Sequence, residues 1–336
     1  MNLSRRDFVK SGSAAMLAAG LKGPSKANAG EKNVKKPGKT EHTRFAVNLE
    51  IWWSKEDILE RIRRTAALGY PAVEFWGCEG KDLDAIKAAC DGHGLEIAQF
   101  TAWGFEPGMN VSANHDRFGE KIREACAVAK KLNCRKATVV GGNDQPGMND
   151  PANHGLFEEK IRLACSIAKK LNCRKATVVG GNDRPGMTQE EMHRNITAGL
   201  KRVAPIAEDS GLMLILEPMN IRVDHKGHCL YGSPAAVKIC REVNSPMVKI
   251  NWDLYHMQLS EGDLCGHLKE GFDQVGYVQV ADAPGRHEPG TGEISYARVL
   301  KEVADLGYRD FVGLECWPEK DPETAAQRIA KMDRWE

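Results

Sequence analysis

The sequence has almost no net charge and lacks the motifs of several large protein classes. Its 47 Lys and Arg residues and 46 Asp and Glu residues leave a net charge of +1, so no strong field attracts a polyanion or an anionic membrane. No G-x-G-x-x-G follows the first predicted strand, and no Gly-Lys-Ser/Thr accompanies a glycine-rich turn. These absences argue against a dinucleotide-binding sheet and against a phosphate-binding loop. We therefore expect a small-molecule ligand and no nucleic-acid partner.

The ten cysteines include no C-x-x-C pair. A chain of 336 residues buries enough apolar surface to fold without disulfide bonds. Cys90, Cys126, Cys165 and Cys240 fall on apolar faces of predicted helices, where cysteine usually behaves as a small buried hydrophobe. We expect free thiols.

The first 29 residues differ in character from the rest of the chain. An Arg5-Arg6 pair precedes a short apolar run at residues 11–21, and Ala27-Asn28-Ala29 follows it. This order is typical of a twin-arginine export signal with its cleavage site, and the run is too short to span a bilayer. Residues 30–42, which are rich in lysine, predict a solvated linker. We expect a periplasmic or otherwise exported protein without a membrane anchor in its mature form; the alternative is a basic disordered tail.

From residue 44 onward, short β-rich segments alternate with longer segments of helical period. This alternation is typical of parallel strands joined by crossover helices, and it predicts a (βα)8 TIM barrel over residues 43–336. Ser54 is expected to cap the first helix, which Gly69 ends. The predicted strands are residues 44–53, 72–77, 96–103, 136–142, 175–181, 212–220, 248–256, 276–282 and 311–317.

The ninth strand comes from an internal repeat. Residues 113–150 recur as residues 152–189, with 29 of 38 positions identical. Each copy holds one helix and one strand, so the repeat is a single duplicated helix–strand unit rather than a solenoid. Because strand number and tilt are coupled in a barrel, we expect one copy to be displaced over the rim or paired with another molecule. Its apolar helix face and strand edge would favour a homo-oligomer.

Four predicted strands end in polar side chains that a purely structural barrel does not need. Three are the carboxylates of Glu217, Asp253 and Glu315, and the fourth is the amide of Gln279. The C-terminal ends of barrel strands converge on one face, where three carboxylates would repel one another without a cation. Oxygen ligands of this kind suit Mg²⁺ or Mn²⁺. The pattern predicts a metal site; helix capping, pairing with lysine or hydrogen bonding in the core is the alternative for each residue alone.

The segments around these residues carry specific motifs: Glu217-Pro218-Met219-Asn220, residues 252–258 (WDLYHMQ), residues 279–293 (QVADAPGRHEPGTGE) and Gly313-Leu314-Glu315. They resemble the motifs of the hydroxypyruvate isomerase family, which lies among the xylose-isomerase-like barrels together with ketose 3-epimerases. The resemblance runs from about residue 44 to the end, apart from the additional copy. It implies a metal held by Glu217, Asp253, Gln279 and Glu315, with the two glutamates acting as acid–base partners.

This chemistry would move a proton between adjacent carbons of a small hydroxy-carbonyl compound through an enediolate. His256 is expected to hydrogen-bond a substrate oxygen, although a structural histidine is the alternative. Arg286 is expected to bind a substrate carboxylate, which would favour hydroxypyruvate over a neutral sugar. The alternative for Arg286 is a loop ion pair with Asp282 or Glu288.

One loop departs from the familiar isomerases. Where they tend to continue toward a Pro-Gly-Tyr segment, this chain has Arg222-Val223-Asp224-His225-Lys226-Gly227-His228. Because this loop is expected to line the substrate pocket, the substrate stays open. The first hypothesis is conversion of hydroxypyruvate to tartronate semialdehyde or a similar reaction. The alternatives are a ketose 3-epimerase and a non-catalytic periplasmic sugar-binding protein.

Overall fold

The computed structural model describes residues 35–75, 80–103, 137–139, 149–155, 158, 161–162, 175–211 and 213–335. The predicted export signal at residues 1–29 and the predicted helix of the first repeat lie outside these residues. The predicted linker is described from residue 35 onward. There the backbone N–H of Gly38 donates to the Leu68 carbonyl (2.8 Å), and the N–H of His42 donates to Asp333 Oδ2 (2.9 Å). This stretch is therefore attached to the folded domain.

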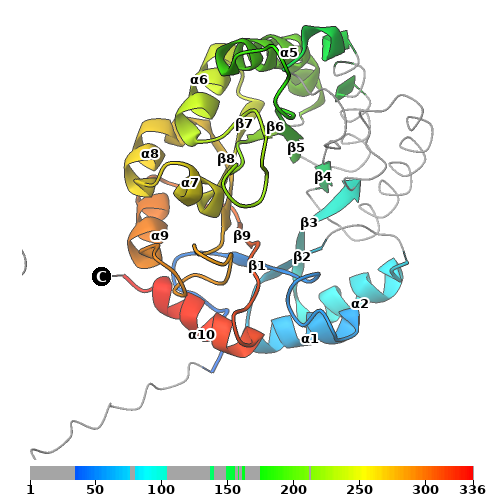
Figure 1. Ribbon diagram of the computed structural model, residues 1–336. Helices are drawn as coiled ribbons and strands as arrows, with labels where there is room; N and C mark the ends of the chain where they lie inside the picture. The colour runs from blue at the N-terminus through cyan, green and yellow to red at the C-terminus, as the bar shows by residue number, and fades with distance from the viewer. Residues whose placement is uncertain are drawn as a thin grey trace, which may run out of the picture. The chain divides into compact units, whose positions relative to one another are not determined.

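The described residues form a TIM barrel built on a nine-stranded, wholly parallel sheet with the order β4-β3-β2-β1-β9-β8-β7-β6-β5. Figure 1 shows the helices on the outside of the curled sheet. Each predicted strand is confirmed. The strands are β1 (Phe45–Asn48), β2 (Ala72–Phe75), β3 (Glu96–Trp103), β4 (Ala137–Val139), β5 (Lys175–Val179), β6 (Met213–Glu217), β7 (Val248–Asp253), β8 (Val275–Val280) and β9 (Val312–Leu314).

Both repeated strands belong to this sheet, so the expectation that one copy would be displaced is wrong for the strands. β4 of the first copy pairs with β3, and β5 of the second copy pairs with β6. β4 and β5 contact each other, while their described residues form no ladder. The physical reason is that β3 and β6 each present an edge of unpaired backbone groups, and two near-identical strands can cover one edge each.

Eight helices and two short 3₁₀ segments are described: α1 (Ile58–Leu68), α2 (Leu83–His93), α5 (Gln189–Ser210), α6 (Ser233–Val243), α7 (Leu254–Ser260), α8 (Leu264–Gly271), α9 (Tyr296–Asp305), α10 (Pro322–Met332), η2 (Pro151–Asn153) and η3 (Phe272–Gln274). The predicted cap Ser54 is wrong, because Asp57 accepts a hydrogen bond from the Leu59 N–H (2.8 Å) and begins α1 three residues later. Gly69 ends α1 as predicted, with φ at 87°.

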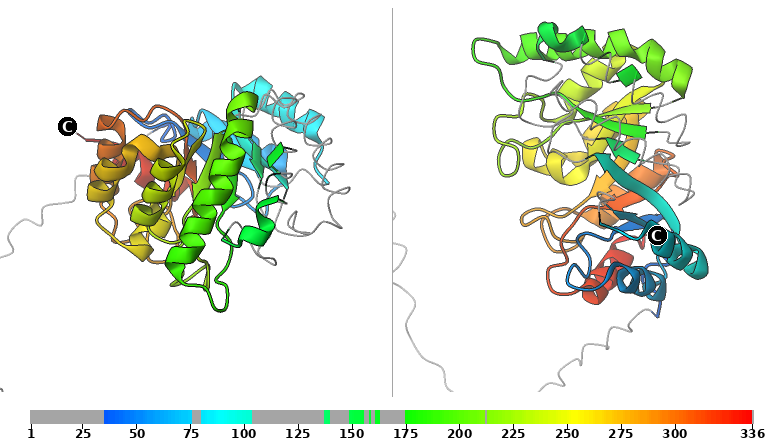
Figure 2. Two further views of the ribbon diagram at one scale, coloured as in Figure 1. Left: turned by 90° about the horizontal axis from the view of Figure 1, so that it is seen from above. Right: turned by 90° about the vertical axis from the view of Figure 1, so that its right-hand side faces the viewer.

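The two ends of the domain meet at neighbouring helices. Figure 1 and the right view of Figure 2 show α10 beside α1, and Arg64 Nη1 of α1 lies 3.3 Å from Glu323 Oε1 of α10. The adjacent strands β1 and β9 are paired as well. The barrel is therefore closed between its first and last strands.

Side chains alternate between two environments along each strand. On β7, Ile250 and Trp252 pack in the large apolar cluster between sheet and helices. Asn251 and Asp253, between and after them, face the barrel interior, where a second, small apolar cluster includes Tyr277. At the C-terminal ends of the strands the barrel interior is polar, and the site residues lie there.

The described cysteines are free, as expected: Cys90, Cys229, Cys240, Cys265 and Cys316. Cys126 and Cys165 lie outside the described residues. Among the described helices, none combines the length and the apolar character that crossing a bilayer requires.

Candidate active site

The predicted metal-site residues lie together at the C-terminal end of the barrel. Glu217 and Asp253 are the last residues of β6 and β7, and Glu315 follows β9 directly. Gln279 of β8 is in register with Asp253. These strands are neighbours in the sheet, so the fold brings their ends to one side of the barrel as predicted.

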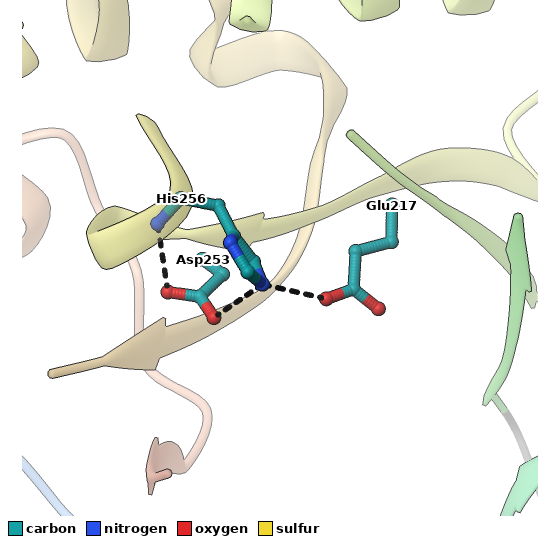
Figure 3. A group of neighbouring side chains, drawn as sticks. All are labelled: Glu217, Asp253 and His256. Carbon is teal, nitrogen blue, oxygen red and sulfur yellow. Dashed lines mark hydrogen bonds and ion pairs between the residues drawn. The ribbon is translucent and has the colours of Figure 1, made fainter. Parts of the chain in front are cut away.

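Glu217, Asp253 and His256 form the tightest group (Figure 3). One ligand atom from each lies within 4.8 Å of the other two. His256 Nε2 is 3.6 Å from Asp253 Oδ2 and 3.9 Å from Glu217 Oε1, and the side chains of His256 and Asp253 are only 1% exposed. Asp253 is fixed because its Oδ1 caps α7, accepting from the Tyr255 N–H (2.8 Å).

A hydrogen-bond network sets the tautomer of His256. The Asn220 side chain is oriented by its Oδ1, which accepts from the Val223 N–H (2.9 Å), so its Nδ2 is free to donate. Asn220 Nδ2 lies 2.7 Å from His256 Nδ1, and the Asn220 backbone N–H also donates to Nδ1 (3.3 Å). Burial lowers the pKa of His256 to about 4, so the ring is neutral at pH 7. Nε2 therefore carries the hydrogen, and in this arrangement His256 is a donor rather than a metal ligand.

The pKa values of Glu217 and Glu315 are both raised. Burial, followed by the nearby charges of Glu315 and Asp253, raises the pKa of Glu217 to about 8. Burial also raises the pKa of Glu315, although the Arg286 guanidinium opposes this. Burial is the main cause of both shifts, and perturbed pKa values of this kind are common at functional sites.

Arg286 supplies positive charge at this site. Its Nη2 donates to Glu315 Oε2 (3.0 Å) and lies 3.7 Å from Asp253 Oδ2. Its Nη1 is 3.9 Å from Asp224 Oδ1, beyond hydrogen-bond distance. Its Nε is buried and has no hydrogen-bond partner in the part of the chain that the structure describes. One side of the guanidinium can therefore accept a further anionic partner.

The alternative ion pairs considered for Arg286 are not formed. Asp282 instead accepts backbone N–H groups, including those of Gly290 (2.8 Å) and Ile294 (3.1 Å), and thereby shapes the loop. Glu288 is fully buried and accepts from Arg328 Nη1 (2.8 Å). Both acids hold the loop that carries Arg286.

Gln279 is hydrogen-bonded to a residue of the neighbouring strand β7. Its Oε1 accepts from Asn251 Nδ2 (2.8 Å), and the Asn251 side chain also hydrogen-bonds Glu217. Gln279 is therefore connected to Glu217 through Asn251. Sequence reasoning missed Asn251, although its position two residues before Asp253 puts it on the same face of β7.

The loop that departs from the familiar isomerases reaches the site, as expected. Asp224 accepts from Asn220 Nδ2 (2.7 Å), and the His225 ring centroid lies 5.3 Å from that of His256. Burial works against ionisation of Asp224, but hydrogen bonds from Asn220 and Tyr255 and the charge of Arg286 lower its pKa overall. The sequence places Asp224 in a loop expected to line the pocket but does not reveal its contact with Tyr255, because that contact joins the loop to helix α7.

The donor set fits a divalent cation. Glu217, Asp253 and Glu315 bring three carboxylates together, and Arg286 is the cation that contacts Glu315 and Asp253. Burial and then the charges of Glu315 and Asp253 raise the pKa of Glu217, and Arg286 only partly opposes this. Carboxylate and amide oxygens are ligands that hard divalent ions prefer. Glu217 and Asp253 belong to the tight group, and Arg286 joins Glu315 to Asp253.

Comparison with known proteins identifies relatives of the whole barrel. A family model described as xylose isomerase-like TIM barrel matches residues 150–334. Hydroxypyruvate isomerase of Escherichia coli (strain K12) is 28% identical, over 83% of this chain and 95% of that protein. 2-oxo-tetronate isomerase of Cupriavidus necator is 27% identical, over 82% of this chain and 93% of that protein.

A solved structure shows the same fold. The crystal structure of an AP endonuclease, family 2, from Brucella melitensis superposes with a TM-score of 0.61 at 24% sequence identity, covering 84% of this chain and 96% of that one. Together with the family match over more than half of its length, this means that the chain belongs to the xylose isomerase-like TIM barrel family, and it is an enzyme of the isomerase type.

Proposed function

We propose that the chain is a metal-dependent isomerase of a small hydroxy-keto acid, of the type that converts hydroxypyruvate to tartronate semialdehyde. The observation that carries the proposal is a pair of glutamates, Glu217 and Glu315, whose side chains are 12% and 22% exposed, beside an arginine with an unpartnered buried Nε among the described residues. Similarity along most of the chain to hydroxypyruvate isomerase and 2-oxo-tetronate isomerase supports the same reaction class.

Glu217 and Glu315 are the proposed acid–base pair. A bound metal would replace the proton that Glu217 holds in the metal-free protein, so its ionised carboxylate would be available to remove a proton from a substrate carbon. Glu315 accepts a hydrogen bond from Arg286, which favours its ionised form. Two carboxyl groups in unlike environments suit a reaction in which one removes a proton from a substrate carbon and the other returns one to the neighbouring carbon, through an enediolate.

His256 and Arg286 are the proposed substrate-binding residues. The Nε2–H of His256 is directed at the two carboxylates, where it can donate to a substrate oxygen. The Nη1 and Nε groups of Arg286 form no hydrogen bond with the described residues, so a substrate carboxylate can occupy them. Holding both ends of the substrate aligns its reacting carbons with the glutamates.

A divalent metal, Mg²⁺ or Mn²⁺, would be held by Glu217, Asp253, Gln279 and Glu315. When bound, it polarises the substrate oxygens and stabilises the negative charge that develops on them. Asn251 and Arg286 then orient the ligand side chains by hydrogen bonding to Glu217, Gln279 and Glu315.

The two other hypotheses fit less well. A ketose 3-epimerase would act on a neutral sugar and would leave the free side of Arg286 without an anionic partner. A sugar-binding protein needs no carboxyl group poised near pH 8, and burying one without a function is costly. The isomerase is therefore the preferred proposal.

We also propose export through the twin-arginine route, on the strength of Arg5-Arg6 and Ala27-Asn28-Ala29. Replacing both arginines by lysine is expected to retain the protein in the cytoplasm. Cell fractionation that still finds the double variant outside the cytoplasm would contradict the proposal.

The test of the proposed function is turnover with and without metal. Enzyme loaded with Mg²⁺ or Mn²⁺ is expected to convert hydroxypyruvate or 2-oxo-tetronate, and EDTA treatment is expected to abolish this. Asp253→Asn should lower kcat/KM by about a hundredfold or more, because it removes a metal ligand. Glu190→Gln, at an exposed position on α5, is the matched control. Epimerisation of a ketose, with both keto acids left unchanged, would reject the isomerase.

A further inference from the structure

His228 is a buried imidazole that the proposed mechanism does not use. His228 is 2% exposed, and its Nε2 atom has no hydrogen-bond partner among the described residues. Buried polar atoms in folded proteins are nearly always hydrogen-bonded. The Nε2 atom therefore calls for a partner that the described chain does not supply.

The position of His228 is fixed between two loops at the C-terminal end of the barrel. It lies in the loop that follows β6 and forms a bridge with Asn182, in the loop that follows β5. On either side, the Cys229 N–H donates to the Gly181 carbonyl (3.0 Å) and the Asp183 N–H donates to the Gly227 carbonyl (2.7 Å). This is the end of the barrel where substrates bind in such folds.

His228 is linked to the site through His225. Its backbone N–H donates to the His225 carbonyl (3.0 Å). The charges of His225 and His256 act on its ionisation, and their rings are 5.3 Å apart. His228 is thus the third imidazole of a group that begins at the reacting end of the site.

A three-carbon substrate needs no contact of this kind. On the proposed function, Arg286 binds its carboxylate, while Glu217, Glu315 and His256 serve its carbonyl and hydroxyl carbons. No polar group of a three-carbon acid then remains to bind His228. Burial lowers the pKa of His228 to about 4, so the ring is uncharged at pH 7 and suits a neutral partner that both donates and accepts. A hydroxyl group has these properties.

We propose that His228 Nε2 hydrogen-bonds a hydroxyl of the substrate beyond the reacting carbons, so that the enzyme takes a hydroxylated keto acid of four or more carbons. The inference rests on the proposed function and goes further by naming the length of the substrate. It also gives the loop that departs from the familiar isomerases a role in specificity.

The test compares the metal-loaded, full-length enzyme on hydroxypyruvate and on 2-oxo-tetronate, a three-carbon and a four-carbon keto acid. The wild type is expected to favour the four-carbon acid in kcat/KM. His228→Leu should lower kcat/KM by about tenfold for the four-carbon acid and less than about twofold for hydroxypyruvate, as the loss of one hydrogen bond predicts. His228→Gln, which keeps a hydrogen-bonding group, should recover most of the loss.

His193→Leu is the matched control, because His193 Nε2 contacts the Cys229 carbonyl (3.0 Å) from the outer side of the same segment. It should change the ratio of the two kcat/KM values by less than about twofold. Equal losses on both acids in His228→Leu, or no loss, would overturn the inference. If His228→Leu does not fold, the wild-type enzyme still decides: a preference for hydroxypyruvate overturns the inference about His228 but not the proposed isomerase activity. Turnover of neither acid would overturn both the inference and the proposed function.

Discussion

The stability of the metal-free protein should fall as the pH rises from 5 to 8, and Glu217→Gln should remove much of that loss. Burial and the charges of Glu315 and Asp253 raise the pKa of Glu217 from 4.5 to about 8 in the folded state. Between these values the folded chain keeps a proton that the unfolded chain has released. The stabilisation is therefore complete below pH 4.5 and is lost as the pH approaches 8.

The size of the effect follows from the difference between the two pKa values. The pKa of Glu217 differs by about 3.5 units between the unfolded value of 4.5 and the folded value of about 8. At ~1.36 kcal/mol per unit, this corresponds to a loss of about 5 kcal/mol in the free energy of unfolding at pH 8. This is an upper limit, because Glu315 titrates in the same cluster and shares the proton. We expect a loss on the order of 3 kcal/mol from this group.

The assay is urea denaturation in EDTA at pH 5 and pH 8 for the wild type, Glu217→Gln and the exposed control Glu190→Gln. The wild type and the control should lose stability over this range in parallel, while Glu217→Gln should lose much less. Added Mg²⁺ or Mn²⁺ should restore the wild type at pH 8, because the metal replaces the proton. Equal pH slopes in wild type and Glu217→Gln would refute the reasoning.

Three further predictions concern substrate binding, tautomer control and folding. Arg286→Lys should raise KM for a keto acid by about tenfold with a smaller change in kcat, since lysine lacks the planar guanidinium; an unchanged KM in steady-state kinetics would contradict this. Asn220→Ala should lower kcat by about tenfold, because His256 Nδ1 loses the Asn220 side-chain donor that helps to fix its tautomer. A 15N NMR spectrum of the variant that still shows the Nε2–H tautomer would contradict this role of Asn220. Asp57→Ala should destabilise the fold by about 1 kcal/mol in thermal or urea unfolding while Ser54→Ala changes little; the reverse order would show that the cap is misassigned.

The strands and the site residues at their ends were predictable because both depend on local sequence. Each strand is a short β-rich run between helical segments, and Glu217, Asp253 and Glu315 are recognisable as carboxylates where apolar runs stop. A parallel barrel then places strand ends on one face whatever their distance in the sequence. The cap at Asp57 was missed because Ser54 and Asp57 are both good capping residues, and the choice depends on where the preceding turn ends.

The remaining features depend on contacts between distant segments. The inclusion of both repeated strands is decided by the open edges of β3 and β6, which no local pattern reveals. The partners of Arg286 are a similar case, because the loop closest in sequence offered Asp282 and Glu288, whereas the fold presents Glu315 and Asp253. Such choices are settled by tertiary packing after the elements have formed.

The most direct test of the central claim, that Glu217 and Glu315 transfer the substrate proton, is proton NMR of the metal-loaded enzyme with hydroxypyruvate or 2-oxo-tetronate in D2O. The wild type should form the isomeric product and take up solvent deuterium at a reacting carbon. Glu217→Gln and Glu315→Gln should each slow product formation by about a hundredfold or more, in line with the loss of a general acid or base. Product formation at the wild-type rate in both variants would contradict the account.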